Sequence, residues 1–255
     1  MKISEMLYDA AKYPFSGVKQ LLLLGLMLLI ISLLLGQNDE FYIILQNILG
    51  DNGLLIVLLP FLIISAVFIL IEAGYSFKVI EESILRVNTP PKFNNFTHMI
   101  KHGINEIFIA FIYFIVPFII LLVILDDAFS QINLGLPQIS DELTIFIIIA
   151  AFLIGFVADI IFTVAIPHMA SKGGAFREAF RFSEIFHKIK QIGFKKLFLS
   201  YIIVILGIVI IGGPILKEIV GSANIYGFFI SEELIAPYLI MFASRFTALI
   251  YMESL

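Results

Sequence analysis

The chain has 255 residues, of which 60% are hydrophobic and only 14% charged, and its mean hydropathy is +1.05. Soluble domains carry about a quarter of their residues as charged side chains, so this composition excludes an ordinary soluble enzyme and a disordered chain. The formal net charge of -4, without a basic tail, argues against nucleic acid as a partner, and the absence of cysteine excludes disulfides, iron–sulfur clusters and thiol catalysis.

Six apolar segments are long enough to cross a bilayer as helices, which need about 20 mostly apolar residues. They are residues 20–35, 54–77, 107–125, 143–170, 197–216 and 227–252. Strands of a membrane barrel would alternate polar and apolar residues, and these segments do not. The sequence therefore predicts an all-α fold, a bundle of six transmembrane helices forming a single integral membrane domain over residues 1–255.

Amphipathic helical spacing precedes three of the spans. The apolar positions are Ile3, Met6, Leu7 and Ala10, then Phe93, Phe96, Met99 and Ile100, then Phe182, Ile185, Phe186, Ile189 and Ile192. We expect cytoplasmic helices at the headgroup boundary, with their apolar faces toward lipid. They could sense lipid, dock a partner or simply connect spans. Anionic headgroups would be met by Arg177, Arg181, Lys188, Lys190, Lys195 and Lys196.

The basic residues also indicate an orientation. Almost all of the 16 lysines and arginines lie before the first span, between spans two and three, or between spans four and five. The alternate connections carry acidic residues, and only Lys217 departs from the pattern. Cytoplasmic connections are enriched in Lys and Arg, so both termini are expected on the cytoplasmic side of the cell membrane.

Short similarities suggest an internal repeat. Residues 103–113 and 193–203 each begin with glycine and lead into a span, and Pro14-Phe15 occupies the corresponding place before the first span. The unit would be an amphipathic helix followed by a two-span hairpin, used over residues 1–86, 87–175 and 176–255. An even number of spans per unit would give all copies the same orientation.

Several of these features together resemble a known family. They are Tyr13-Pro14-Phe15 before the first span, Gly74-Tyr75 ending the second, and Pro90-Pro91-Lys92-Phe93 with Gly103 before the third. The chain resembles domain-of-unknown-function family 4013, a group of prokaryotic, often archaeal, polytopic membrane proteins. The resemblance implies location and architecture, and it carries over no functional residues.

We single out three ionisable residues inside predicted spans, where charge is costly and is therefore a sign of function. They are Glu72, Asp159 and Arg245. We expect Asp159 and Arg245 to pair inside the bundle, with Glu72 near the inner rim. The cluster could be a polar pocket for an ion, a proton or a headgroup, or a structural ion pair with a snorkelling glutamate.

The histidines do not form a recognisable metal motif. His98 and His102 have the i, i+4 spacing of metal ligands, but no glutamate follows His98 and Lys101 lies between them. They are expected to be interfacial side chains, and Pro167-His168 to mark a helix end. No metal site or other cofactor is predicted.

Functional motifs are also absent: the chain has no phosphate-binding loop, dinucleotide fingerprint, nucleophile elbow or H-E-x-x-H sequence. The favoured interpretation is a non-enzymatic binding or scaffolding module whose partners are membrane lipids, another membrane protein or a second copy of the chain. The alternatives are a small transporter or channel using Glu72, Asp159 and Arg245, and an intramembrane lipid-modifying enzyme.

Overall fold

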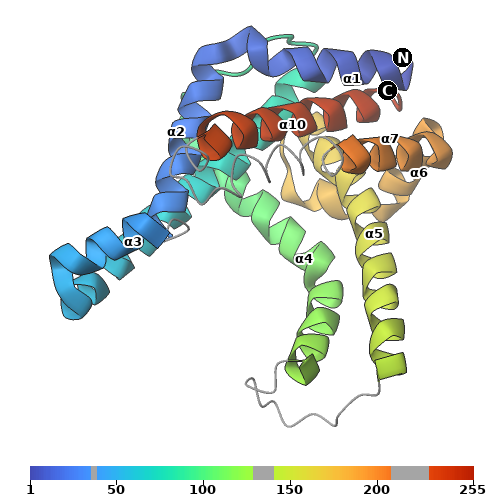
Figure 1. The fold of residues 1–255 in the computed structure, drawn as a ribbon. Helices are drawn as coiled ribbons and strands as arrows, with labels where there is room; N and C mark the ends of the chain where they lie inside the picture. Colours follow the sequence, from blue (N-terminus) through green and yellow to red (C-terminus); the bar gives the residue numbers. More distant parts are fainter. Residues whose placement is uncertain (36–38, 129–140, 208–229) are drawn as a thin grey trace.

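The computed structural model describes residues 1–35, 39–128, 141–207 and 230–255 and contains helices but no strands within those ranges (Figure 1). The helices are α1 (Ile3–Lys12), α2 (Val18–Leu34), α3 (Asp39–Ile84), α4 (Phe96–Ala128), α5 (Asp141–Ser171), α6 (Phe182–Ile192), α7 (Phe194–Gly207) and α10 (Ala236–Met252). Shorter turns are η1 (Tyr13–Gly17), η2 (Phe176–Phe180) and the π-helical turn η4 (Ser231–Ile235). The predicted all-α fold is confirmed.

Five helical stretches are long and apolar enough to cross a membrane: Ile3–Leu34, Ile56–Ile84, Phe96–Leu122, Ile145–Ser171 and Glu233–Met252. They coincide with five of the six predicted spans. The remaining predicted span, residues 197–216, begins in α7, and its second half lies outside the described residues. The chain is a multi-pass membrane protein, and side chains such as Phe111, Phe146 and Phe152, all more than half exposed, form the apolar surface that lipid covers.

Helix α3 contains the turn of the first hairpin. Gly50 has a φ of 65°, in the left-handed region, and a Cβ at this position would meet nothing within 4 Å. Glycine adopts this conformation without steric cost, so the chain reverses direction there. The residues after Gly50 then run back toward α1 and α4 (Figure 1).

One amphipathic helix was wrongly predicted as a separate element. Helix α4 begins at Phe96 and continues without a break to Ala128, so residues 96–100 are the first turns of the third span. The break comes earlier, at Pro90-Pro91 and at Asn95, whose φ is 57°. Gly103 does not interrupt the helix, and its missing side chain leaves room for the Leu70 backbone of α3.

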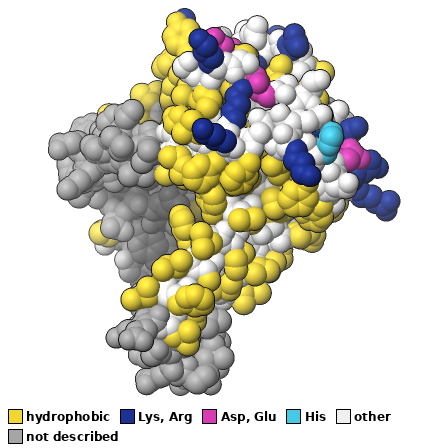
Figure 2. All heavy atoms as spheres, turned by 90° about the vertical axis from the view of Figure 1, so that its right-hand side faces the viewer, with side chains coloured by type: hydrophobic (Ala, Val, Ile, Leu, Met, Phe, Trp, Pro, Cys, Tyr) yellow, Lys and Arg dark blue, Asp and Glu magenta, His cyan; other side chains and the backbone are white. Residues whose placement is uncertain are grey.

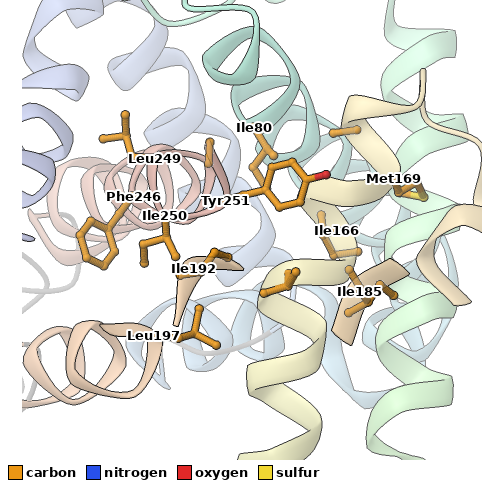
Figure 3. Close-up of a cluster of buried hydrophobic side chains, with 14 of the residues drawn as sticks. Ile80, Ile166, Met169, Ile185, Ile192, Leu197, Phe246, Leu249, Ile250 and Tyr251 are labelled. Atoms are coloured by element: carbon orange, nitrogen blue, oxygen red, sulfur yellow. The ribbon is translucent and has the colours of Figure 1, made fainter. Parts of the chain in front are cut away.

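Helices α1 and α6 are separate elements, as predicted, but their apolar faces pack on protein. Met6 and Ala10 of α1 and Ile185, Ile189 and Ile192 of α6 are buried in a core shared with α5 and α10. Figure 3 shows the α6 and α10 side chains meeting beside Ile166 and Met169 of α5. The prediction that these faces rest on lipid is therefore wrong for the five buried residues.

Helices α3 and α4 cross at two glycines. A Cβ on Gly74 would lie 1.9 Å from the Met99 carbonyl oxygen, and one on Gly103 would lie 1.9 Å from the Leu70 carbonyl oxygen. Small residues allow helix backbones to approach closely in membranes, where packing replaces the hydrophobic effect as the driving force. The two glycines therefore set the spacing of the second and third spans.

Both termini and the basic connections meet at one end of the molecule, which we term the basic end: residues 1–17, 85–95, 172–196 and 252–255. Helices α1 and α10 lie side by side there (Figure 1). Hydrogen bonds join these segments: Lys196 to the Met1 carbonyl and to Glu253, Lys188 to the Ser254 carbonyl, and Tyr13 to the Thr89 carbonyl.

Candidate functional site at the basic end

Arg245 forms the central polar contact of the basic end. It lies in α10 and its side chain is only 4% exposed. Its Nε donates to Asp9 Oδ1 at 2.7 Å, its Nη1 to the Val87 carbonyl at 2.9 Å and its Nη2 to Asn88 Oδ1 at 2.9 Å. The guanidinium also lies 4.9 Å from the centre of the Tyr13 ring. One arginine thus ties α10 to α1 and to the connection between α3 and α4.

The predicted pairing of Arg245 with Asp159 is wrong. Asp159 lies on the side of α5 that faces α7, where the Tyr201 hydroxyl hydrogen-bonds to its carboxyl group. Arg245 points toward α1 instead, because α10 lies between α1 and the region of α5 and α7 that contains Asp159. Helical position within a span did not reveal which neighbour each side chain would face.

Glu72 was expected near the inner rim of the bundle, with no partner named. It hydrogen-bonds with Ser76 one turn later in α3, and it is close enough to act electrostatically on Glu106 of α4. Glu106 Oε2 is buried and has no hydrogen-bond partner among the described residues. The structure therefore places two carboxyl groups together at the α3–α4 contact, separate from both Asp159 and Arg245.

The six predicted headgroup residues divide into two sets. Three of them have partners within the protein. Arg181 pairs with Glu178 and Glu184, and Lys188 donates to the Ser254 carbonyl. Lys196 pairs with Glu253 and donates to the Met1 carbonyl. The other three are exposed and have no ion pair within the described ranges: Arg177, Lys190 and Lys195. Half of the predicted set thus holds the fold together, and half is free to meet a ligand.

Exposed aromatic side chains accompany the free basic residues. Phe182, Phe186 and Phe194 are 47%, 47% and 61% exposed. Phe186 and Lys190 also line an open groove of about 570 Å³ along α6, together with His187. Figure 2 shows Lys and Arg side chains gathered over the upper part of this face, above a broad hydrophobic surface. We term Arg177, Phe182, Phe186, Lys190, Phe194 and Lys195 the α6 strip.

Two carboxylates that form ion pairs beside the α6 strip remain charged near neutral pH. The hydrogen bond from Arg181 lowers the pKa of Glu184, and the same bond raises the pKa of Arg181. Hydrogen bonds from Lys196 and from the terminal amino group of Met1 lower the pKa of Glu253. These carboxylates therefore stay ionised and hold their basic partners away from other ligands.

Four residues that complete these contacts were not predicted: Asp9, Asn88, Glu106 and Tyr201. Asp9 and Asn88 lie outside the predicted spans, where a polar residue does not by itself indicate a functional site. Glu106 immediately precedes the predicted third span and was excluded by one position. Extending that span to the observed start of α4 would have marked Glu106 as an ionisable residue within lipid.

The class of protein is defined by these observations: a multi-pass, all-helical membrane protein whose basic residues and termini gather at one end. Residues 57–217, more than half of the chain, match the family described as "Protein of unknown function (DUF4013)". The chain belongs to this family, as the motifs around Gly74 and Pro90 predicted. Neither a curated protein nor a solved structure matches it.

Proposed function

We propose that this protein is a non-enzymatic binding module of the cytoplasmic membrane, which holds its basic end toward the cytoplasm and binds anionic lipid headgroups on the α6 strip. The observation that carries the proposal is the combination of free cations and exposed aromatic rings in that strip. Aromatic rings favour the boundary between acyl chains and headgroups, and each Lys or Arg near an anionic surface contributes about 1 kcal/mol.

The packing of the interior supports binding rather than transport. The interior of the described residues contains two hydrophobic clusters, with members such as Leu24, Met99 and Ile185, and its buried polar side chains are mainly serines, together with Arg245, His102 and His168. A further pocket between α5, α7 and α10 has a volume of about 160 Å³ and is lined mainly by apolar groups. These apolar surroundings favour a binding module, in which a rigid helix bundle supports a surface site, over a transporter, which needs a water-filled path.

Lipid-dependent stability tests this function. The purified protein is titrated in neutral detergent with phosphatidylglycerol or phosphatidylcholine, and unfolding is followed by circular dichroism while bound lipid is counted by native mass spectrometry. Phosphatidylglycerol should raise Tm more than phosphatidylcholine. Replacing Arg177, Lys190 and Lys195 together with glutamine should weaken the apparent affinity about 100-fold, because about 3 kcal/mol of headgroup attraction is lost.

The matched control replaces three other exposed lysines, Lys2, Lys19 and Lys101, with glutamine. This variant has the same net charge as the first and leaves the α6 strip intact, so it should retain the phosphatidylglycerol effect. Equal losses in the two triple variants would show that net charge alone attracts lipid. Equal stabilisation by the two lipids in the natural protein would reject the proposed site.

A second candidate function, transport of protons or small cations, is favoured by Glu72 and Glu106, two acidic side chains on neighbouring helices that interact electrostatically. His102 and His98 precede Glu106 at four-residue intervals on α4, with their Nε2 atoms 3.1 Å apart. In liposomes carrying a pH-sensitive dye, this function requires proton flux that Glu106→Gln abolishes. Liposomes that are no more permeable with the protein than without it would reject the transport function.

A further inference from the structure

His168 stands near the end of α5, where it meets two glutamates from the segment that follows. Its side chain is 1% exposed, and its Nε2 atom lies 3.3 Å from Glu184 Oε2 and 3.9 Å from Glu178 Oε2. Glu178 belongs to η2 and Glu184 to α6, so three elements supply the three groups. All three atoms lie within 4.8 Å of one another. Three potential metal ligands therefore converge at this point.

The neighbouring hydroxyl groups determine which nitrogen of His168 carries the proton. Ser171 Oγ donates its one hydrogen to the His168 carbonyl at 2.8 Å. The Tyr251 hydroxyl, 3.1 Å from Ser171 Oγ, must then donate to Ser171 and accept from His168 Nδ1, which lies 3.0 Å away. A neutral imidazole bonded in this way has its lone pair on Nε2, the atom that faces the glutamates.

The atoms that point into the site have no other hydrogen-bond partner. Both His168 Nε2 and Glu178 Oε2 are buried without one among the described residues. Arg181 occupies the opposite oxygens, with its Nε 3.2 Å from Glu178 Oε1 and its Nη1 2.8 Å from Glu184 Oε1. Buried polar atoms are normally satisfied, so Glu178 Oε2 and the His168 Nε2 lone pair call for a cation between them, and Glu184 Oε2 lies within reach of the same ion.

We propose that His168, Glu178 and Glu184 bind one divalent transition-metal ion, with zinc as the representative ion. Metal bonds of about 2.0–2.2 Å in tetrahedral geometry separate neighbouring ligand atoms by about 3.3 Å, which agrees with the distance from His168 to Glu184. The two carboxylates offset the charge of the ion, while Arg181 on their opposite oxygens leaves one positive charge in the cluster. Tyr251 holds the imidazole from its far side, as outer partners of ligating histidines do.

The site is accessible to solvent, and an ion bound there would have a structural consequence. Glu184 is 41% exposed and also lines the open groove along α6, so an ion can enter from that side. The ion would join the end of α5 to η2 and to the first turn of α6. It would thereby fix the segment that presents Lys190 and Phe186, although the site itself does not depend on lipid binding.

Zinc binding by the purified protein tests the proposal. The protein, freed of any affinity tag and treated with chelator, is titrated with zinc by calorimetry in neutral detergent, and X-ray absorption identifies the ligands. We expect one ion per chain, bound through one imidazole nitrogen and carboxylate oxygens. Glu184→Gln and Glu178→Gln should each weaken binding by about tenfold or more, because each removes one ligand charge.

His187→Gln is the matched control, since His187 is an exposed histidine on α6, the helix that carries Glu184, and lies outside the proposed metal site. It should bind zinc with unchanged affinity. Circular dichroism verifies that each variant is folded, and the absorption spectrum of the natural protein provides a test that needs no variant. Failure to bind one ion per chain, a spectrum without imidazole nitrogen, or unchanged affinity in both glutamine variants would each overturn the site.

Discussion

Arg245 determines how α10 is attached to the basic end. Its buried guanidinium has three acceptors, and two of them, Val87 and Asn88, belong to a single short connection. Hydrogen bonds to charged groups contribute more than neutral ones, and breaking a buried charged pair is costly. The residue joins α10 to α1 and to the α3–α4 connection, and it does not pair with Asp159.

Replacing this arginine should therefore destabilise the protein. We expect Arg245→Ala to lower the free energy of unfolding by about 2–3 kcal/mol, at the lower end of the range for buried pairs because Asp9 is 38% exposed and can be hydrated. Thermal unfolding in detergent measures the loss. Arg177→Ala, which removes an exposed and unpaired arginine, should change stability by less than about 0.5 kcal/mol. Similar losses in both variants would contradict the role of Arg245 in joining these elements.

Glu253 should make stability depend on acid. Its pKa in the folded protein is lowered by hydrogen bonds from Lys196 and the terminal amino group, from an ordinary value of 4.5. Its contribution is therefore complete above about pH 4.5 and is lost as the pH falls through the depressed pKa. Thermal unfolding should show Glu253→Gln less stable than the natural protein at pH 7, with the difference shrinking toward pH 3. A difference independent of pH would contradict this assignment.

At the scale of elements, the close crossing of α3 and α4 depends on Gly74 and Gly103, which have no side chain. The atoms that an added Cβ would strike, the carbonyl oxygens of Met99 and Leu70, belong to helix backbone. Backbone cannot rotate away as a side chain can, so both helices would have to separate. Gly74 and Gly103 thus specify the crossing more strictly than the apolar residues around them.

Gly74→Ala and Gly103→Ala should each lower the free energy of unfolding by at least about 2 kcal/mol through overpacking. The control is Gly155→Ala in α5, where the new methyl group would meet Pro117 side-chain atoms at 3.6–4.0 Å, an ordinary contact distance. That variant should be neutral or slightly more stable, because alanine favours helix. Thermal unfolding of the three variants provides the comparison, and equal effects would show that the crossing tolerates a methyl group.

Elements whose length and polarity are set by the bilayer could be predicted from the sequence. Spans could be predicted because the bilayer sets their length and polarity, and α6 because its apolar residues recur at helical spacing. Contacts between distant segments were not predictable in this way. Asp9 and Arg245 are 236 positions apart, and only packing reveals that they meet. His168, Glu178 and Glu184 come from three elements with no metal-motif spacing, which is why His168 was interpreted only as a helix end.

For the whole molecule, the distribution of lysine and arginine predicts which end faces the cytoplasm. The chain has no cysteine, so single introduced cysteines report accessibility without background. In intact cells, a thiol reagent that cannot cross the membrane should label Asn47→Cys and should leave Ser183→Cys unlabelled until the cells are opened. Labelling of Ser183→Cys in intact cells would reverse the orientation and place the α6 strip outside.

The contact between α1 and α10 has a consequence for biosynthesis. Residues 3–12 are synthesised long before α10, yet Met6 and Ala10 are buried in a core shared with Phe246, Leu249 and Ile250. The buried side of α1 therefore stays uncovered until α10 has been synthesised and inserted. A chain released before residue 236 would lack the partner of Asp9 and would leave Met6 and Ala10 without the α10 side chains that cover them.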